Sequence, residues 1–163
     1  MIEISKKIIL VGSVNVGKTS LVNQYIHHRF SEQYISTIGV RIDKKQIEIK
    51  GTILNLIIWD LAGESSQQNT PQSYFLGAGG IIYVVDATSP PTFLNMSEEI
   101  AFLKSKLPHV PLLIVANKCD LLNDSEMNAT KKLFPKTPDF LSSAKTGDYV
   151  EDVFSQLAEL LLL

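Results

Sequence analysis

The sequence contains a single cysteine, Cys119, among its 163 residues. One cysteine cannot form a disulfide within the chain or a zinc site built from several cysteines. Such scarcity is typical of proteins in a reducing compartment, so we expect a cytoplasmic location.

Long hydrophobic runs are also missing. The longest apolar stretches fall well short of the ~20 residues that a membrane-spanning helix needs. Residues 1–7 include charged side chains and do not resemble a secretory signal peptide. We therefore expect neither a membrane span nor secretion.

Neither sign of charge is in large excess. The 15 Lys and Arg residues face 17 Asp and Glu residues, giving a formal net charge of -2. No overall positive field favours nucleic acid or an anionic membrane, so any anion site must be local. A hydrophobic content of 45% is typical of a globular protein, and the length suits a single domain over 1–163.

Short apolar runs alternate with amphipathic segments, which indicates an α/β fold. The runs at 8–11, 81–85 and 112–116 are continuous, as in central parallel strands covered on both faces. Runs at 40–50 and 52–59 flank Lys50 and Gly51 and predict a hairpin with one antiparallel edge strand. With a short strand at 139–141, the pattern predicts a six-stranded, mostly parallel sheet. About five helices should flank it, at 19–28, 68–75, 92–106, 125–133 and 149–161.

The segment from Gly12 to Thr19 matches the phosphate-loop pattern G-x-x-x-x-G-K-[ST], between a predicted strand and a predicted helix. Inward backbone N–H groups and the positive end of the helix favour phosphate there. Nucleotide binding is a better interpretation than a glycine turn that only begins a helix. The candidate nucleotide-binding residues are Ser13, Val14, Asn15, Val16, Gly17, Lys18, Thr19 and Ser20.

Two residue types near this loop suit a magnesium nucleotide. The Lys18 ammonium can bridge the outer phosphates, and the Thr19 hydroxyl is placed to bind Mg²⁺. Asp60 ends the apolar run at 54–59 and could hold a water bound to the metal. A lone aspartate after a strand is more often a turn residue, but Gly63 follows, whose N–H can turn toward a terminal phosphate.

Two further loops follow predicted strands, with Asn117-Lys118-Cys119-Asp120 in one and Ser142-Ser143-Ala144-Lys145 in the other. The Asp120 carboxylate could accept both N–H groups that guanine presents, whereas adenine has no such pair of donors. Discrimination of this kind reaches ~10⁴. Taken alone, the first tetrapeptide would be interpreted as an ordinary solvated loop. It is informative because it is in register with the other motifs along the chain.

Over nearly its whole length the sequence resembles the small GTPases of the Ras superfamily, most closely the Rab family. The resemblance rests on residues 12–20, 34–40, 59–60, 62–63, 117–120 and 143–145. It implies a P-loop NTPase G domain, a GTP hydrolase (EC 3.6.5 type) that binds GTP or GDP with Mg²⁺. A phosphate-loop kinase using ATP is a remote alternative, because Asp120 favours guanine.

The resemblance also implies roles for individual residues. Thr37 would bind Mg²⁺ with Thr19 and Asp60 when the γ-phosphate is present, and the Gly63 N–H would contact that phosphate. The predicted contacts to the nucleotide otherwise come from Phe30, Tyr34, Asn117, Lys118, Asp120, Ser143, Ala144 and Lys145. Within this set, Phe30 would pack on the guanine edge, Lys118 and Lys145 would sandwich the base, and the Ala144 N–H would bind guanine O6. Tyr34 would cover the phosphates, and Asn117 would tie the base loop to the phosphate loop.

The implied mechanism is a conformational switch in which γ-phosphate and Mg²⁺ order residues 30–41 and 62–75. Effectors, exchange factors and GTPase-activating proteins would read the ordered surface of a monomer. Its apolar face would consist of Ile38, Val40, Ile42, Trp59 and Tyr74, although strand packing alone could explain these residues.

Glu64 departs from the family, which normally has glutamine at this position. With Lys18 and Gly63 it forms the predicted catalytic set, but a carboxylate cannot donate a hydrogen bond to phosphoryl oxygens and opposes their charge. Val14 adds bulk near the γ-phosphate. We expect slow hydrolysis, or a GTP-loaded scaffold that does not cycle. Alternatively, Glu64 points to solvent, Val14 packs beneath the flexible segment, and turnover resembles that of relatives.

The C-terminal residues also depart from the Rab pattern. The sequence stops after Leu160 to Leu163 without the flexible extension and terminal cysteines of Rab proteins, so we expect no prenyl anchor to be encoded in it. The leucines continue an amphipathic pattern with Val153 and Leu157, which indicates a helix packed on the sheet.

The base assignment predicts the effect of Asp120→Asn. This variant should lose affinity for guanine nucleotides and gain affinity for xanthine nucleotides, because an amide donor suits the xanthine carbonyl. Competition between GDP and xanthosine diphosphate measures the change. An unchanged preference would contradict the assignment of Asp120.

Overall fold

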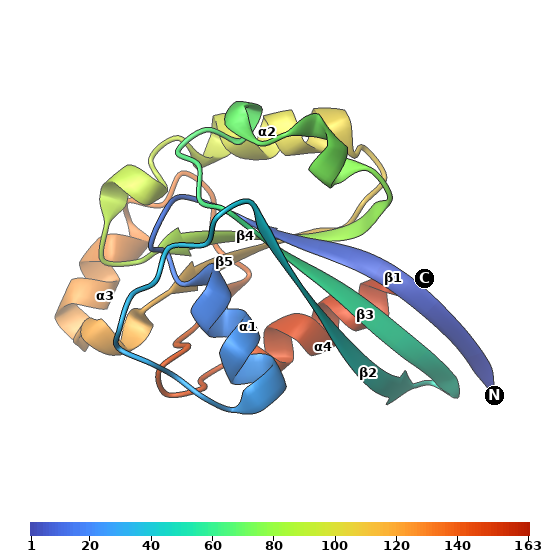
Figure 1. Cartoon of the computed structure of the whole chain (residues 1–163). Coiled ribbons are helices and arrows are strands. Elements are labelled where there is room, and N and C mark those ends of the chain that lie inside the picture. Colours follow the sequence, from blue (N-terminus) through green and yellow to red (C-terminus); the bar gives the residue numbers. More distant parts are fainter.

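The computed structural model describes all residues, 1–163, as one sheet with helices on both faces (Figure 1). The six strands have the order β2-β3-β1-β4-β5-β6. Their bounds are β1 Ile2–Val11, β2 Val40–Ile49, β3 Thr52–Leu61, β4 Ala78–Asp86, β5 Leu112–Asn117 and β6 Phe140–Leu141. The predicted six-stranded α/β fold is confirmed.

The strand pairing also follows the prediction. Edge strand β2 is antiparallel to β3, from Val40 opposite Leu61 to Ile49 opposite Thr52, and all other pairs are parallel. Lys50 and Gly51 form the hairpin turn with φ of 50° and 75°. Positive φ at both positions is the backbone of a type I′ turn, which matches the twist of the two strands.

Strand β1 begins at Ile2, six positions before the predicted apolar run. It pairs with β3 from Ile2 to Leu10, whereas its pairing with β4 covers only Lys7 to Val11. The first half is therefore half-exposed, and its alternating polar residues conceal the strand from a search for continuous apolar runs.

The α-helices are α1 Lys18–His27, α2 Met96–Lys106, α3 Asp124–Lys131 and α4 Val150–Leu161. One of the five predicted helices, at 68–75, is wrong: two 3-10 turns, η1 Gln67–Asn69 and η2 Gln72–Phe75, replace it. Pro71 lies between them. Proline lacks an N–H and disfavours helical backbone before it, and Thr70 is extended (φ −72°, ψ 132°).

Two hydrophobic clusters hold the layers together. One joins the sheet to α1 and α4 and includes Tyr25 and Phe154, whose stacked rings lie 4.0 Å apart. The other joins the opposite face to α2 through residues such as Ile100 and Leu103. No helix is long and apolar enough to cross a membrane.

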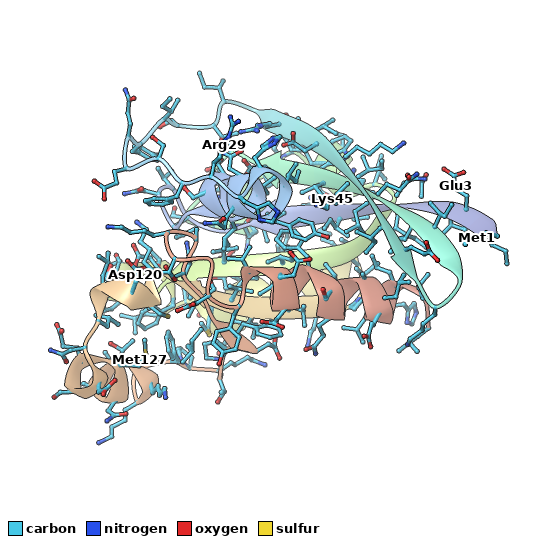
Figure 2. The ribbon with its side chains drawn as sticks, turned by 90° about the horizontal axis from the view of Figure 1, so that it is seen from below. Met1, Glu3, Arg29, Lys45, Asp120 and Met127 are labelled. Atoms are coloured by element: carbon cyan, nitrogen blue, oxygen red, sulfur yellow. The ribbon has the colours of Figure 1, made fainter.

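The carboxyl ends of the parallel strands lie at the same end of the sheet, and the candidate residues gather there. Leu10 pairs with Asp60, and Asp86 pairs with Asn117, so the loops that follow these strands are neighbours. Asp120 lies at this end, and Met1 and Glu3 lie at the other (Figure 2). The topology therefore unites segments that are distant in sequence.

Truncation of Phe154 should test the larger core cluster. Phe154→Ala should lower the free energy of unfolding by about 3–5 kcal/mol, because it removes a 1% exposed ring stacked on Tyr25. Chemical denaturation measures the loss. Gln156→Ala, an exposed position on the same helix, should change stability by less than about 0.5 kcal/mol. Equal losses in both variants would contradict this packing.

Candidate nucleotide-binding site

The phosphate loop links β1 to α1 and curls around the Lys18 ammonium. Lys18 Nζ donates to the carbonyl oxygens of Gly12, at 3.1 Å, and Ser13, at 2.9 Å. Burial lowers the pKa of Lys18 to about 8, against the opposing effects of the Asp60 and Glu64 carboxylates. The Lys18 ammonium is therefore largely shielded from water, and it lines the cleft where an anion can approach it.

Gly17 begins α1 with φ of 101°, a conformation that L side chains rarely adopt. A Cβ atom there would lie 2.2 Å from the Asn117 side-chain nitrogen. Asn117 fills that space, and its Nδ2 donates to the Val16 carbonyl at 3.1 Å. Glycine at this position therefore lets the base loop dock against the phosphate loop.

An oxygen cluster lies at the start of α1. Thr19 Oγ1 donates to Asp60 Oδ2 at 2.5 Å and lies 2.7 Å from Thr37 Oγ1. Asp60 is fully buried, and its other oxygen, Oδ1, has no hydrogen-bond partner. Burial raises the pKa of Asp60, while the Thr19 hydrogen bond and the Lys18 and Arg41 charges oppose the rise. Two hydroxyls and a carboxylate with a free oxygen are the hard ligands that suit Mg²⁺.

Gly63 and Glu64 lie directly against the phosphate loop. A Cβ on Gly63 would lie 2.5 Å from the Val14 backbone, and the Glu64 N–H donates to the Gly12 carbonyl at 3.1 Å. The Glu64 side chain is half-buried and lies near Lys18. Its charge partly offsets the lowering of the Lys18 pKa by burial. The structure thus brings together the three predicted catalytic residues.

The base loops converge on the Asn117 amide. Its Oδ1 accepts from the Ser142 hydroxyl and from the Ala144 N–H, each at 3.1 Å. Asp120 Oδ1 accepts from the Ser143 hydroxyl at 2.8 Å, which fixes the orientation of that carboxylate. Hydrogen bonds between the two base loops thus hold four of the predicted residues, Asn117, Asp120, Ser143 and Ala144.

A cleft of about 770 Å³ joins the phosphate loop to the base loops. Its volume is within the usual range for a small-molecule site. The predicted residues that line it are Val14, Asn15, Gly17, Lys18, Thr19, Ser20, Phe30, Tyr34, Thr37, Gly63, Asn117, Lys118, Asp120, Ala144 and Lys145. Ser13, Val16, Asp60, Glu64 and Ser143 are not in the lining and lie behind it or beside it.

Several residues that pair with site residues are not predicted from the sequence. Asp86, at the end of β4, accepts from Lys118 Nζ at 3.1 Å, and Glu32 pairs with Lys145 at 3.0 Å. The hydrogen bond to Glu32 raises the pKa of Lys145. Asp86 could have been found, because it follows an apolar run as Asp60 does. Glu32 lies in an irregular segment, and no sequence signal pairs it with Lys145.

Beside the cleft, the expected partner face is partly exposed. Ile38 is 93% exposed and Ile42 is 52% exposed. Trp59 packs edge-on to Tyr74 with ring centroids 6.1 Å apart, and Lys7 Nζ lies 3.6 Å from the centre of the Trp59 ring. Trp59 and Tyr74 therefore pack within the structure as well as contributing to the surface.

The surroundings of Cys119 favour the protonated thiol over the thiolate. Its S–H donates to the Ala116 carbonyl at 3.2 Å, and burial raises its pKa to about 11. A thiol that stays protonated is a poor nucleophile.

The fold and cleft define an α/β domain of the phosphate-loop class. The family model described as the Ras family matches residues 7–162. Ras-related protein Rab7 of Drosophila melanogaster is 34% identical over 162 residues, covering 94% of this chain and 78% of the relative. Ras-related protein Rab-32C of Dictyostelium discoideum is 33% identical, covering 98% and 74%.

A third relative, Ras-related protein Rab-13 of Mesocricetus auratus, is 33% identical, covering 96% of this chain and 80% of the relative. The chain belongs to the Ras family. Members of this family are GTPases that bind GTP and GDP, so the chain is a Rab-like small GTPase.

The contact between Gly17 and Asn117 predicts the effect of Gly17→Ala. The added Cβ should displace the Asn117 amide, and the positive φ adds about 1–2 kcal/mol of backbone strain. GDP affinity should therefore fall by at least about tenfold. Titration of a fluorescent GDP measures this. Gly51→Ala is the control, since Gly51 also has positive φ but no neighbour within 4 Å. Equal affinities in the two variants would contradict the proposed docking of the loops.

Proposed function

We propose that this chain is a Rab-like GTP/GDP switch that binds Mg²⁺, hydrolyses GTP slowly and recruits partner proteins in vesicle trafficking. The observation that carries the proposal is the 2.7 Å contact between Thr37 Oγ1 and Thr19 Oγ1. Thr37 belongs to a segment without regular structure, whereas Thr19 lies in the first turn of α1. The contact brings a residue of the predicted first switch to the metal side of the site.

Two regions of the cleft would bind the two parts of the nucleotide. Lys18 and the backbone N–H groups of the phosphate loop would bind the phosphates, and Asp120 would accept from guanine. Mg²⁺ held by Thr19, Thr37 and Asp60 would neutralise charge on the phosphate oxygens. The unpartnered Asp60 Oδ1 supports this ligand set, because a buried carboxylate oxygen is costly without a partner.

Glu64 is the reason to propose slow hydrolysis. Its backbone is held at the phosphate loop by the bond to Gly12, so its side chain starts close to the phosphate end of the cleft. An ionised carboxylate there can accept a proton from water but cannot donate to the phosphoryl oxygens. Its negative charge also opposes the charge of the transferred group.

Val14 supports the same proposal. Its side chain is 55% exposed and lines the cleft next to Gly63. A branched side chain at this point would crowd the attacking water or an arginine supplied by an activating protein. If both effects are strong, the chain acts instead as a GTP-loaded scaffold, and the nucleotide released on denaturation would be mainly GTP.

Partner binding is proposed for the surface around Ile38 and Ile42. These exposed apolar side chains flank the start of β2, next to Thr37. A partner that contacts them would sense whether Thr37 is ordered. Effectors, exchange factors and activating proteins would all read this region, as the likeness to Rab proteins suggests.

Replacement of Glu64 tests the catalytic part of the proposal. Glu64→Gln should raise the single-turnover rate of GTP hydrolysis by about tenfold, because an amide restores a donor and removes a negative charge. Gln68→Ala, an exposed change in the same segment, is the control and should leave the rate unchanged. A wild-type rate equal to or above that of Glu64→Gln would refute slow hydrolysis by this cause.

A further inference from the structure

A carboxylate of α2 is buried against the segment that follows Glu64. Glu99 is 6% exposed, and its Oε2 accepts from the Gln67 backbone N–H at 2.6 Å. Gln67 is itself only 2% exposed. A carboxylate oxygen is a strong acceptor for a buried amide N–H, and either group would be costly to bury without the other.

The same segment has further ties. Asn95, at the start of α2, donates from Nδ2 to the Ser65 carbonyl at 3.2 Å. The Gln67 side chain donates to the Glu64 carbonyl at 3.1 Å and accepts from the Thr70 hydroxyl at 3.2 Å. Figure 1 shows this part of the chain alongside α2. We call residues 63–67 the anchored segment.

The opposite end of the anchored segment rests on the phosphate loop. The Glu64 N–H bonds to Gly12, and the Gly63 backbone packs against Val14. The segment is therefore held between two rigid supports, the phosphate loop and α2. Gly63, whose N–H is the proposed contact to the γ-phosphate, lies at the phosphate-loop end of this segment.

We propose that Glu99 is a positioning residue that pre-orders the anchored segment for a triphosphate, so that the preference for GTP over GDP depends on it. The inference rests on the proposed function, in which Gly63 contacts the γ-phosphate. A ligand that must order a loose segment loses affinity by the cost of that ordering. Because GDP has no γ-phosphate, its affinity does not depend on the placement of Gly63.

The test compares Kd values for GDP and for a non-hydrolysable GTP analogue, both with Mg²⁺. Glu99→Ala should weaken binding of the analogue about tenfold and change GDP binding less than about twofold. Glu99→Gln keeps an oxygen acceptor without its charge and should give an intermediate loss. Glu98→Ala is the matched control, because Glu98 is exposed on the same helix.

Hydrogen exchange at the Gln67 amide supplies a second measurement. Exchange should accelerate in Glu99→Ala, since the bond from that amide is removed, and should stay slow in Glu98→Ala. Asn95→Ala removes the tie at Ser65 and should also lower analogue affinity selectively. If Glu99→Ala does not fold, the Kd values for GDP and the analogue are compared in Asn95→Ala, a variant at a less buried position.

The outcomes separate this inference from the proposed function. Equal losses for GDP and the analogue, or no loss for either, would overturn the positioning role of Glu99. A wild-type chain that binds neither nucleotide would instead overturn the proposed function. A selective loss for the analogue, partly restored in Glu99→Gln, supports the positioning role.

Discussion

The buried side-chain amide of Asn117 is the interaction on which the arrangement of the site depends. It bonds to Val16 in the phosphate loop and to Ser142 and Ala144 in the last base loop. One amide has both donors and acceptors, so a single side chain can satisfy groups of both kinds. The cleft keeps its shape because these loops share one rigid partner.

On the phosphate side of the cleft, polar groups are buried at a cost to stability and kept close to one another. The desolvated Lys18 ammonium, the Asp60 carboxylate and the hydroxyls of Thr19 and Thr37 lie within this region. Desolvation destabilises each charge in the free protein, and the proposed magnesium nucleotide would supply the opposite charges. Sites of this kind gain affinity from charges that are already in place.

Much of the fold and of the candidate site can be predicted from local patterns. The continuous apolar runs locate the central strands, and Lys50-Gly51 locates the hairpin. The helix expected at 68–75 fails because Pro71 interrupts its hydrogen bonding, an effect that outweighs apolar spacing over so short a segment. The first half of β1 is missed because an uncovered strand carries polar residues.

The sequence by itself determines the phosphate loop, because backbone geometry fixes how neighbouring residues such as Gly17 and Lys18 are presented. Tertiary structure alone decides that Glu99 meets Gln67, 32 positions away, and that Glu32 meets Lys145. Such pairs depend on how α2 and the loops pack on the sheet. A charged residue in a helix or loop has many possible partners, and only the packing of the folded chain brings one of them into reach.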